Sequence, residues 1–483
     1  MSDTVYNTKI TAVVYPPPTG DVYGMGSPTS GGIDISALVS EFTYYESIFS
    51  PFCYAEMTIM DSTGSLEGGD DSPLGECGLR KFSCVSITLP DPMSFNKENA
   101  ERSVEAYQWQ GTNCFYVNKI SNQLNKGKKK IYTLKLVPKD SFTSIAKQFI
   151  QHWGSNGTVS SVEYNRVIED ILNDQMQVQK TLNVTEDRTE PTAAYSMHNV
   201  FPLSAIKDIL KKSVSLNQSG SVSGASTGSS SGGTSNTSKE STENMNKKVG
   251  YAFFETYDNF TFRSLESFVN RNHTAGAAPD PDEYHSFSIF PVNDRNVTAQ
   301  QSSQAIISYK HFDDENTTDV LTEVRKKKRG TPKTVRYDVT TNTFKTIEQT
   351  GTETDPCNIT QIDGSFQPIE RDVYTEFQVA YVKVCRESDL SGMPVNPKKY
   401  EPYYEGGVEE IKERTSTIRV PGNLTLKAGD RIFISIPKTQ AENGQPSEVS
   451  DKYSGLFSIV SVAHRLENIN KLYTDLDICK FRD

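Results

Sequence analysis

Short segments in which apolar and polar residues alternate recur through most of this 483-residue chain. Within the first 140 residues, the segments 54–60 and 81–89 alternate in this way, and turn residues follow each of them. In the last part of the chain the same pattern covers residues 416–420, 430–436, 455–465 and 472–481. Alternation places successive side chains on opposite faces of a strand. Many short strands joined by turns predict a mainly β protein built from antiparallel barrels or sandwiches.

Three pairs of strand-like segments lie close enough in sequence to form hairpins. Residues 113–120 and 130–137 flank a polar, basic tip, and residues 249–255 and 260–263 flank a short turn. Residues 334–339 and 343–348 flank the turn at Thr341 and Asn342. We therefore expect three antiparallel hairpins at these positions.

Helical periodicity appears between the two strand-rich regions. Ser141 can cap a helix that places Phe142, Ile145 and Phe149 on one face. A second helix is expected over residues 162–174, and Pro202 starts a third. These helices are short and amphipathic, which favours a connector packed against barrels over a helical bundle.

Residues 217–243 are dominated by Ser, Gly and Thr. Such a segment buries too little apolar surface to offset its ordering entropy, so we interpret it as a flexible insertion. The predicted organisation has five parts. Residues 1–140 form a first tube-type β-barrel, residues 141–216 a helical connector, and residues 217–247 the Ser/Gly-rich insertion. Residues 248–345 form a region of hairpins partly belonging to the second barrel, and residues 346–483 form a second tube-type β-barrel.

The formal net charge is -11 and the sequence pI is about 5.3. This acidic balance argues against a protein that grips nucleic acid, because phosphate neutralisation needs clustered Lys and Arg. It is compatible with a pore whose negative wall lets DNA pass. The first residues carry no basic or apolar run and no segment is long and apolar enough to span a membrane, so neither a signal peptide nor membrane insertion is expected.

The seven cysteines include no C-x-x-C pair, and we expect reduced, buried thiols in a protein made in a cytoplasm.

Two matches to the serine-hydrolase pattern G-x-S-x-G, at Ser226 and Ser230, lie in the Ser/Gly-rich insertion without the required strand and helix. None of the six histidines has a metal-binding spacing. We expect no catalytic residue, no cofactor and no metal. The basic clusters 126–130 and 326–329 are either docking sites for an acidic partner or solvated loops.

Three segments resemble the baseplate hub proteins of contractile-tailed bacteriophages. The first runs from Tyr44-Tyr45-Glu46 through Pro51 to the turn at residues 61–64, and it is similar to the start of the first tube-type barrel of that family. The second is the helix at residues 205–212 followed by the aromatic hairpin at 250–255. The third is the C-terminal pattern that contains Gly455, Phe457, His464, Tyr473 and Thr474. The related hub part of type VI secretion spikes shares these features.

The resemblance implies two tube-type barrels per chain and a homotrimer that forms a pseudo-sixfold ring. Such a ring adapts a threefold central spike below to a sixfold tail tube, or a tube-initiator protein, above, with baseplate wedge proteins as further possible partners. DNA passes through it without specific binding. The implied location is the virion tail baseplate, after synthesis in the host cytoplasm. The residues expected to matter for fold and assembly are Tyr44, Tyr45, Glu46, Pro51, Gly455, Phe457, His464, Tyr473 and Thr474.

Three alternatives remain open from the sequence. A spike of a type VI secretion or other contractile injection system shares the barrels, although such chains usually continue into a β-helical needle, whereas this sequence stops at Asp483. A hub with a peptidoglycan-cleaving activity needs a module with paired carboxylates or a Cys/His site, and the Ser/Gly-rich insertion has neither. A tail-tube or adhesion protein shares the strands but lacks the double barrel.

Overall fold

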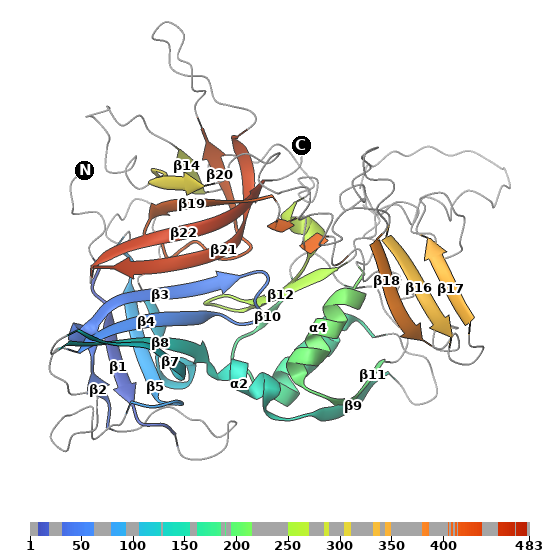
Figure 1. Ribbon diagram of the computed structural model, residues 1–483, viewed down its shortest axis with the longest axis horizontal. Coiled ribbons are helices and arrows are strands. Elements are labelled where there is room, and N and C mark those ends of the chain that lie inside the picture. Colours follow the sequence, from blue (N-terminus) through green and yellow to red (C-terminus); the bar gives the residue numbers. More distant parts are fainter. Residues whose placement is uncertain are drawn as a thin grey trace, which may run out of the picture.

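The computed structural model of the protein consists mainly of β-strands (Figure 1). It describes residues 8–18, 31–61, 79–92, 106–126, 129–154, 162–184, 189, 195–214, 250–269, 285–288, 304–310, 332–338, 343–348, 379–385, 404, 407–408, 411–412, 414–436, 453–468 and 470–480. The prediction of a mainly β protein is therefore confirmed.

The N-terminal part contributes eight strands to a large sheet. They are β1 (Thr11–Tyr15), β2 (Ile33–Asp34), β3 (Val39–Ser47), β4 (Tyr54–Asp61), β5 (Cys84–Pro90), β6 (Ala106–Trp109), β7 (Phe115–Lys126) and β8 (Lys129–Pro138). The strands from β3 follow the order β3-β4-β8-β7-β5-β1-β2, and β6 pairs with β5. β7 pairs with β8 from Phe115 opposite Pro138 to Lys126 opposite Lys129, so the first predicted hairpin is confirmed.

The C-terminal part contributes the other six strands of the same sheet. They are β14 (His285–Ser288), β15 (Ser308–Lys310), β19 (Thr415–Pro421), β20 (Arg431–Ser435), β21 (Gly455–Glu467) and β22 (Lys471–Lys480). Their order is β15-β19-β22-β21, with β20 on the first half of β21 and β14 parallel to β20.

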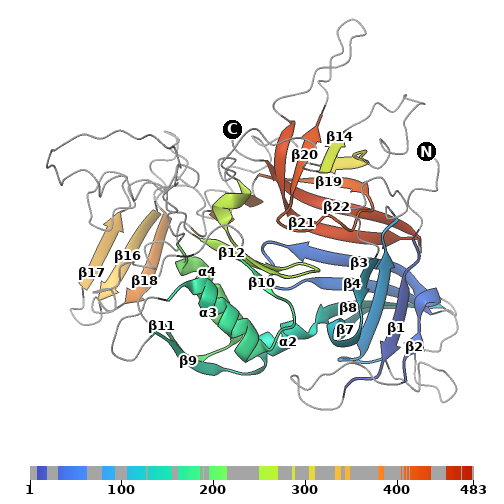
Figure 2. The ribbon, with the colours of Figure 1, turned by 180° about the vertical axis from the view of Figure 1, so that it is seen from behind.

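The two sets of strands meet where β21 pairs with β3. The register runs from Ser461 opposite Ser47 to Leu466 opposite Phe42, and a β-bulge lies between Ile459 and Ser461. We call the three adjacent strands β22, β21 and β3 the seam. Figures 1 and 2 show the C-terminal strands continuing the N-terminal ones in one curled sheet. The strands of the two predicted tube-type units belong to one large, curled, mainly antiparallel sheet in the form of a half-barrel.

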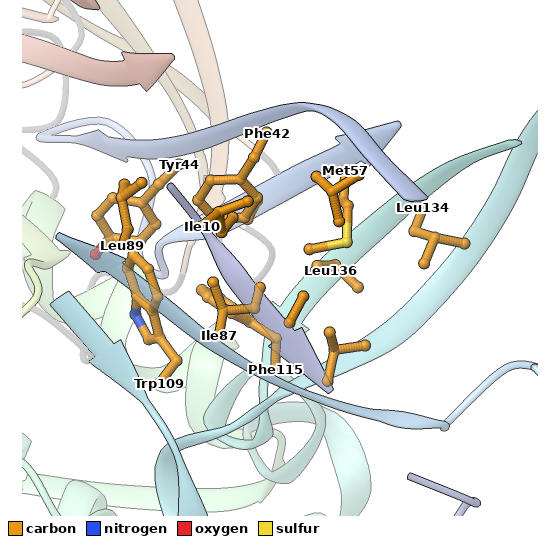
Figure 3. Packing of buried hydrophobic residues seen from close by; sticks show 14 of the residues in the cluster. Ile10, Phe42, Tyr44, Met57, Ile87, Leu89, Trp109, Phe115, Leu134 and Leu136 are labelled. Carbon is orange, nitrogen blue, oxygen red and sulfur yellow. The ribbon is translucent and has the colours of Figure 1, made fainter. Parts of the chain in front are cut away.

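Two hydrophobic cores lie under this sheet. The N-terminal core is rich in aromatic side chains, including Phe42, Tyr44, Tyr107, Trp109 and Phe115, and Figure 3 shows several of them packed together. The C-terminal core consists mostly of aliphatic side chains from β19 to β22. Both follow from the alternation in sequence, because every second residue of these strands faces inward.

A mixed region connects the two parts of the sheet. Its elements are α2 (Lys139–Ala146), β9 (Phe149–Trp153), α3 (Tyr164–Asp170), the π-helical turn Ile171–Met176, β10 (Leu182–Asn183), β11 (Tyr195–Val200), α4 (Pro202–Lys212), β12 (Tyr251–Glu255), β13 (Phe260–Ser264) and a 3-10 turn at Leu265–Phe268. The aromatic hairpin β12–β13 and the helix that starts at Pro202 are confirmed. A separate three-stranded sheet contains β16 (Pro332–Asp338), β17 (Thr343–Glu348) and β18 (Val379–Cys385), which confirms the third hairpin.

Two expectations from the sequence are wrong. The helix expected from Ser141 starts at Lys139, directly after Pro138, and Phe149 lies in β9 and not on the helix face. Pro138 fixes the start, because proline ends the strand and leaves no backbone N–H for the ladder.

Cys84 and Cys114 form a disulfide, whereas Cys53 and Cys479 are buried free thiols as expected. The Ser/Gly-rich insertion and both basic clusters' side chains lie outside the described residues.

Candidate functional site

The register of the seam places residues from the first and third sequence motifs directly opposite one another. Tyr44 on β3 pairs with His464 on β21, which pairs in turn with Thr474 on β22. The rings of Tyr44 and His464 are parallel within 3°, with centroids 6.3 Å apart. Two motifs that are about 400 residues apart in sequence therefore form one structural unit.

His464 is completely buried under this seam. Its Nδ1 lies 3.1 Å from the Thr474 hydroxyl, and that hydroxyl accepts a hydrogen bond from the Asn423 backbone N–H at 3.0 Å. Burial lowers the pKa of His464 to about 3, against an opposing contribution from the backbone of Leu426. The imidazole is therefore neutral at physiological pH, and its tautomer determines whether Nδ1 donates to the Thr474 hydroxyl or accepts from it.

Glu46 is a buried carboxylate that contacts three separate parts of the chain. Its Oε1 accepts hydrogen bonds from the Tyr44 hydroxyl at 3.0 Å and from the Tyr257 backbone N–H at 2.7 Å. Its Oε2 accepts from the Ala428 backbone N–H at 3.0 Å. Glu46 thus connects β3 to the turn between β12 and β13 and to the segment that precedes β20. Burial raises the pKa of Glu46 to about 7, although these three hydrogen bonds favour the charged form.

A second buried carboxylate lies beside this position. Glu255, at the end of β12, accepts a hydrogen bond from the Lys180 ammonium at 2.7 Å and another from the Cys53 backbone N–H at 3.1 Å. Lys180 also donates to the carbonyl of Thr256 at 2.8 Å. Burial acts to lower the pKa of Lys180, but the Glu255 carboxylate outweighs it and the pKa rises. A buried ion pair with satisfied hydrogen bonds fixes the mixed region against β4.

Tyr107 closes the same cluster from the N-terminal side. Its ring stacks on Tyr257 with centroids 3.9 Å apart, and its hydroxyl donates to the carbonyl of Leu424 at 2.5 Å. The ring also lies edge-on to His464, 5.7 Å away. The N-terminal core is therefore joined by hydrogen bonds and ring contacts to the C-terminal strands.

The outward side chains of the seam form a different environment. Tyr45 stacks on Tyr54 of β4 with centroids 4.6 Å apart. Arg419 on β19 binds both oxygens of Asp475, at 2.6 and 2.9 Å, and its guanidinium lies 5.2 Å from the ring of Tyr473. The seam therefore has an inner side of buried polar groups and an outer side of exposed aromatic and charged groups.

Six of the nine residues predicted from the sequence meet at the seam: Tyr44, Tyr45, Glu46, His464, Tyr473 and Thr474. The other three lie away from the stretch where β3 pairs with β21. Pro51 is half-buried in the turn after β3, and Gly455 starts β21 with a φ of +132°. Phe457 is buried in the C-terminal core. A role of these nine residues in assembly stays a prediction.

Sequence reasoning missed the partners of these residues. Tyr107, Tyr257 and Lys180 come from segments that carried no motif, and Glu255 ends the second motif but was not among the predicted site residues. One signal was present, since Glu46 shares the inward face of β3 with Phe42 and Tyr44, and a carboxylate at such a position needs buried donors. The backbone donors of Tyr257 and Ala428 have no sequence signal.

The chemistry available at the seam is that of a buried structural network. Its carboxylates and histidine contact protein groups, and Glu46, Glu255 and His464 are each at most 1% exposed. Within the described ranges, no three His, Cys, Asp or Glu side chains are grouped so as to hold a metal ion. No helix in the described part of the chain is long and apolar enough to cross a membrane.

Comparisons with known proteins give similar solved structures but no sequence relatives. No protein-family model and no curated protein matches the chain. A tail protein from Neisseria meningitidis is similar over 98% of this chain and 96% of its own, with 7% identity and a TM-score of 0.43. The 43 kDa tail protein of prophage MuSo2 from Shewanella oneidensis is similar over 97% and 98%, with 8% identity and a TM-score of 0.42. The E. coli c3393 protein, a type VI secretion component, is similar over 92% and 74%, with 8% identity and a TM-score of 0.38.

Proposed function

We propose that this chain is a structural, non-enzymatic subunit of a contractile-tail baseplate hub. In this proposal three copies form a ring that joins a threefold central spike below to a sixfold tail tube above, and DNA passes through the ring. The sequence motifs at residues 44–64, 205–255 and 455–474 support the assignment to this class of protein.

The observation that carries the proposal is the pairing of β3 with β21. It joins strands from the two ends of the chain into one 14-stranded sheet. Because Glu46 and Tyr107 add buried hydrogen bonds across the same junction, the two curled halves are held in a fixed relation. A subunit with two curled β units side by side supplies six such units when three copies close a ring.

The partners follow from this geometry. A stable ring of three copies needs obligate interfaces, typically above roughly 2,000 Å² each. The spike, the tube or tube-initiator protein and the wedge proteins would bind the two ends and the rim of the ring. Three chains of net charge -11 carry a formal charge of -33, which disfavours tight DNA binding by the ring as a whole. The corresponding location is the tail baseplate of a virion.

Electron microscopy of the purified protein tests the proposal. We expect end-on views with a central hole surrounded by six similar densities, because each copy contributes two curled units. Images should be compared for the protein alone and for the protein co-expressed with a candidate spike protein. Compact particles without a hole in both preparations, or rings with a number of densities not divisible by three, would contradict the proposal.

A further inference from the structure

One face of the large sheet carries basic and acidic residues, several of which form ion pairs. This face consists of the outward side chains of β19, β22, the second half of β21, β3, β4 and β8, and we call it the open face. It lies opposite the two cores, because the inward residues of the same strands, such as Tyr44, His464 and Leu476, are fully buried. Figure 1 shows these strands running side by side across both halves of the molecule.

The cations of the open face are held by carboxylates on neighbouring strands. Arg419 contacts Asp475 at 2.6 Å and Glu467 at 3.3 Å. Arg465 lies 3.3 Å from the same Asp475 and 3.9 Å from the same Glu467. At the other side of the seam, Lys135 on β8 contacts Glu56 on β4 at 3.0 Å. These three cations thereby contact three anions, and the same face also carries Lys471, Glu41 and Asp477.

These cations remain accessible to solvent despite their partners. The side chains of Arg419, Arg465 and Lys135 are 28%, 38% and 49% exposed. A phosphate could reach each of them if its carboxylate partner were absent, because guanidinium and ammonium groups bind phosphate in the same way as carboxylate. The other residues of this face include the small side chains Thr417, Ser461 and Ala463 beside the larger rings of Tyr45, Tyr54 and Tyr473.

We infer that the carboxylates of the open face hold its cations, so that double-stranded DNA passes over this face without being bound. This inference rests on the proposed function, since it assigns the open face to the passage through the ring. It differs from the uniformly negative wall expected from the sequence, because the face combines acidic and basic residues. Ion pairs present less net field to a phosphate backbone than unpaired charges of either sign.

The pairing extends across the described strands but not to every residue. Lys119 on β7 is exposed opposite Lys135 and has no carboxylate within ion-pair distance among the described residues. The wild-type protein should therefore bind DNA weakly at low salt, and that affinity gives a measurable baseline.

The test is the affinity of the full-length protein for a short random-sequence DNA duplex, measured by fluorescence anisotropy over a range of salt concentrations. The variant Glu56→Gln/Glu467→Gln/Asp475→Asn removes the three anions and keeps the three cations. We expect it to bind at least about tenfold tighter than wild type at low salt, with a steeper salt dependence, because released cations displace counterions from phosphates. Adding Arg419→Gln and Arg465→Gln to this variant should return the affinity toward wild type.

A matched control separates this effect from a change in net charge. The variant Glu163→Gln/Glu169→Gln/Asp174→Asn removes the same number of charges from the region of α3 and the π-helical turn. Equal tightening in the control and the test variant, or no tightening in either, would overturn the inference. If the triple variant does not fold, Glu56→Gln alone frees Lys135 and should give a smaller increase in affinity, and no increase would overturn the inference. The solution mass of the same samples reports on the ring separately, so failure of the proposed function is distinguished from failure of this inference.

Discussion

The two cores of the large sheet differ in what they are made of and in where their residues come from. The N-terminal core is built around aromatic rings, and it includes Leu424, Leu466 and Leu472 from the C-terminal part of the chain. The C-terminal core is mostly Ile, Leu and Val, and its residues come from position 287 onward. The N-terminal core therefore takes part of its packing from the C-terminal part of the chain, whereas the described residues of the C-terminal core all come from the C-terminal part itself.

This asymmetry explains why the sequence motifs sit where they do. Aromatic residues with hydroxyl groups, such as Tyr44 and Tyr107, need hydrogen-bond partners when buried. Tyr107 donates to Leu424, far away in the sequence, and Tyr44 donates to Glu46 on its own strand, which in turn accepts from distant backbone N–H groups. An aliphatic core needs only volume and alternation. The side-chain hydrogen bonds that determine how the two ends of the chain join therefore come mainly from the N-terminal side of the seam.

The largest expected effect comes from two leucines on one strand that serve different cores. Leu472 belongs to the N-terminal core and Leu476, on the same face of β22, belongs to the C-terminal core. Either Leu→Ala change should lower the free energy of unfolding by about 3 kcal/mol, because each leaves a cavity. In a Trp153→Phe background, only Leu472→Ala should shift the fluorescence of Trp109 in the folded state. Equal shifts for both variants would remove the distinction between the cores.

The next effect concerns the carboxylate that joins three parts of the chain. At pH 5 to 6 the Glu46 carboxyl is protonated, but both of its oxygens can still accept a hydrogen bond, whereas the NH2 group introduced by Glu46→Gln cannot, so we expect a loss of about 2 kcal/mol in unfolding free energy. Glu41→Gln, an exposed residue on the same strand, is the control and should change stability by less than about 0.5 kcal/mol. Chemical denaturation measures both, and similar small losses would show that Glu46 contributes no specific connection.

The buried groups Glu46 on β3 and His464 on β21 should make stability respond to pH in opposite directions. The pKa of His464 falls from 6.5 to about 3 in the folded protein, so only the unfolded chain binds its proton between these values, and stability falls as pH falls from 6.5 to 3. The pKa of Glu46 rises from 4.5 to about 7, so only the folded protein holds its proton between these values, and stability falls as pH rises from 4.5 to 7.

Variants at these two positions separate the contributions. The destabilisation caused by His464→Gln should shrink as pH is lowered below 6.5, by at most about 1.4 kcal/mol per pH unit. The destabilisation caused by Glu46→Gln should shrink as pH is raised from 4.5 to 7. Unfolding measured by denaturant at several pH values tests both, and differences that do not change with pH would contradict the assigned protonation states.

The smallest effect on stability is expected on the open face. Glu56→Gln breaks the contact with the half-exposed Lys135, and exposed pairs contribute little, so the loss should be below about 0.5 kcal/mol and should vanish at high salt. A loss as large as that of Glu46→Gln would mean that the two sides of the sheet are not distinct in their contribution to stability.

The regular parts of this fold were predictable from local patterns. Alternation located the strands that became β4, β5, β21 and β22, and turn residues located the hairpin of β7 and β8. The start of α2 was misplaced, because Pro138 and the following strand β9 decide its boundaries and not the apolar spacing of Phe142 and Phe149. The disulfide between Cys84 and Cys114 was missed, because its cysteines are 30 residues apart and only the register of β5 and β7 brings them together.

The candidate site was only half visible in the sequence. The resemblance marked Tyr44, Glu46, His464 and Thr474 as important, but nothing in the sequence indicated that Tyr44 pairs with His464 across β3 and β21 or that His464 pairs in turn with Thr474 on β22. Their remaining partners include backbone N–H groups of Tyr257, Ala428 and Asn423, which every residue but proline possesses. Pairing between strands far apart in sequence depends on tertiary structure, and local patterns do not contain it.

The solution mass of the purified full-length protein tests the central claim most directly. Light scattering coupled to size-exclusion chromatography should give about 161 kDa, three times the chain mass of 53.8 kDa, either for the protein alone or after co-expression with its spike. A mass of 53.8 kDa under both conditions, at concentrations where an obligate trimer is assembled, would contradict the proposed ring.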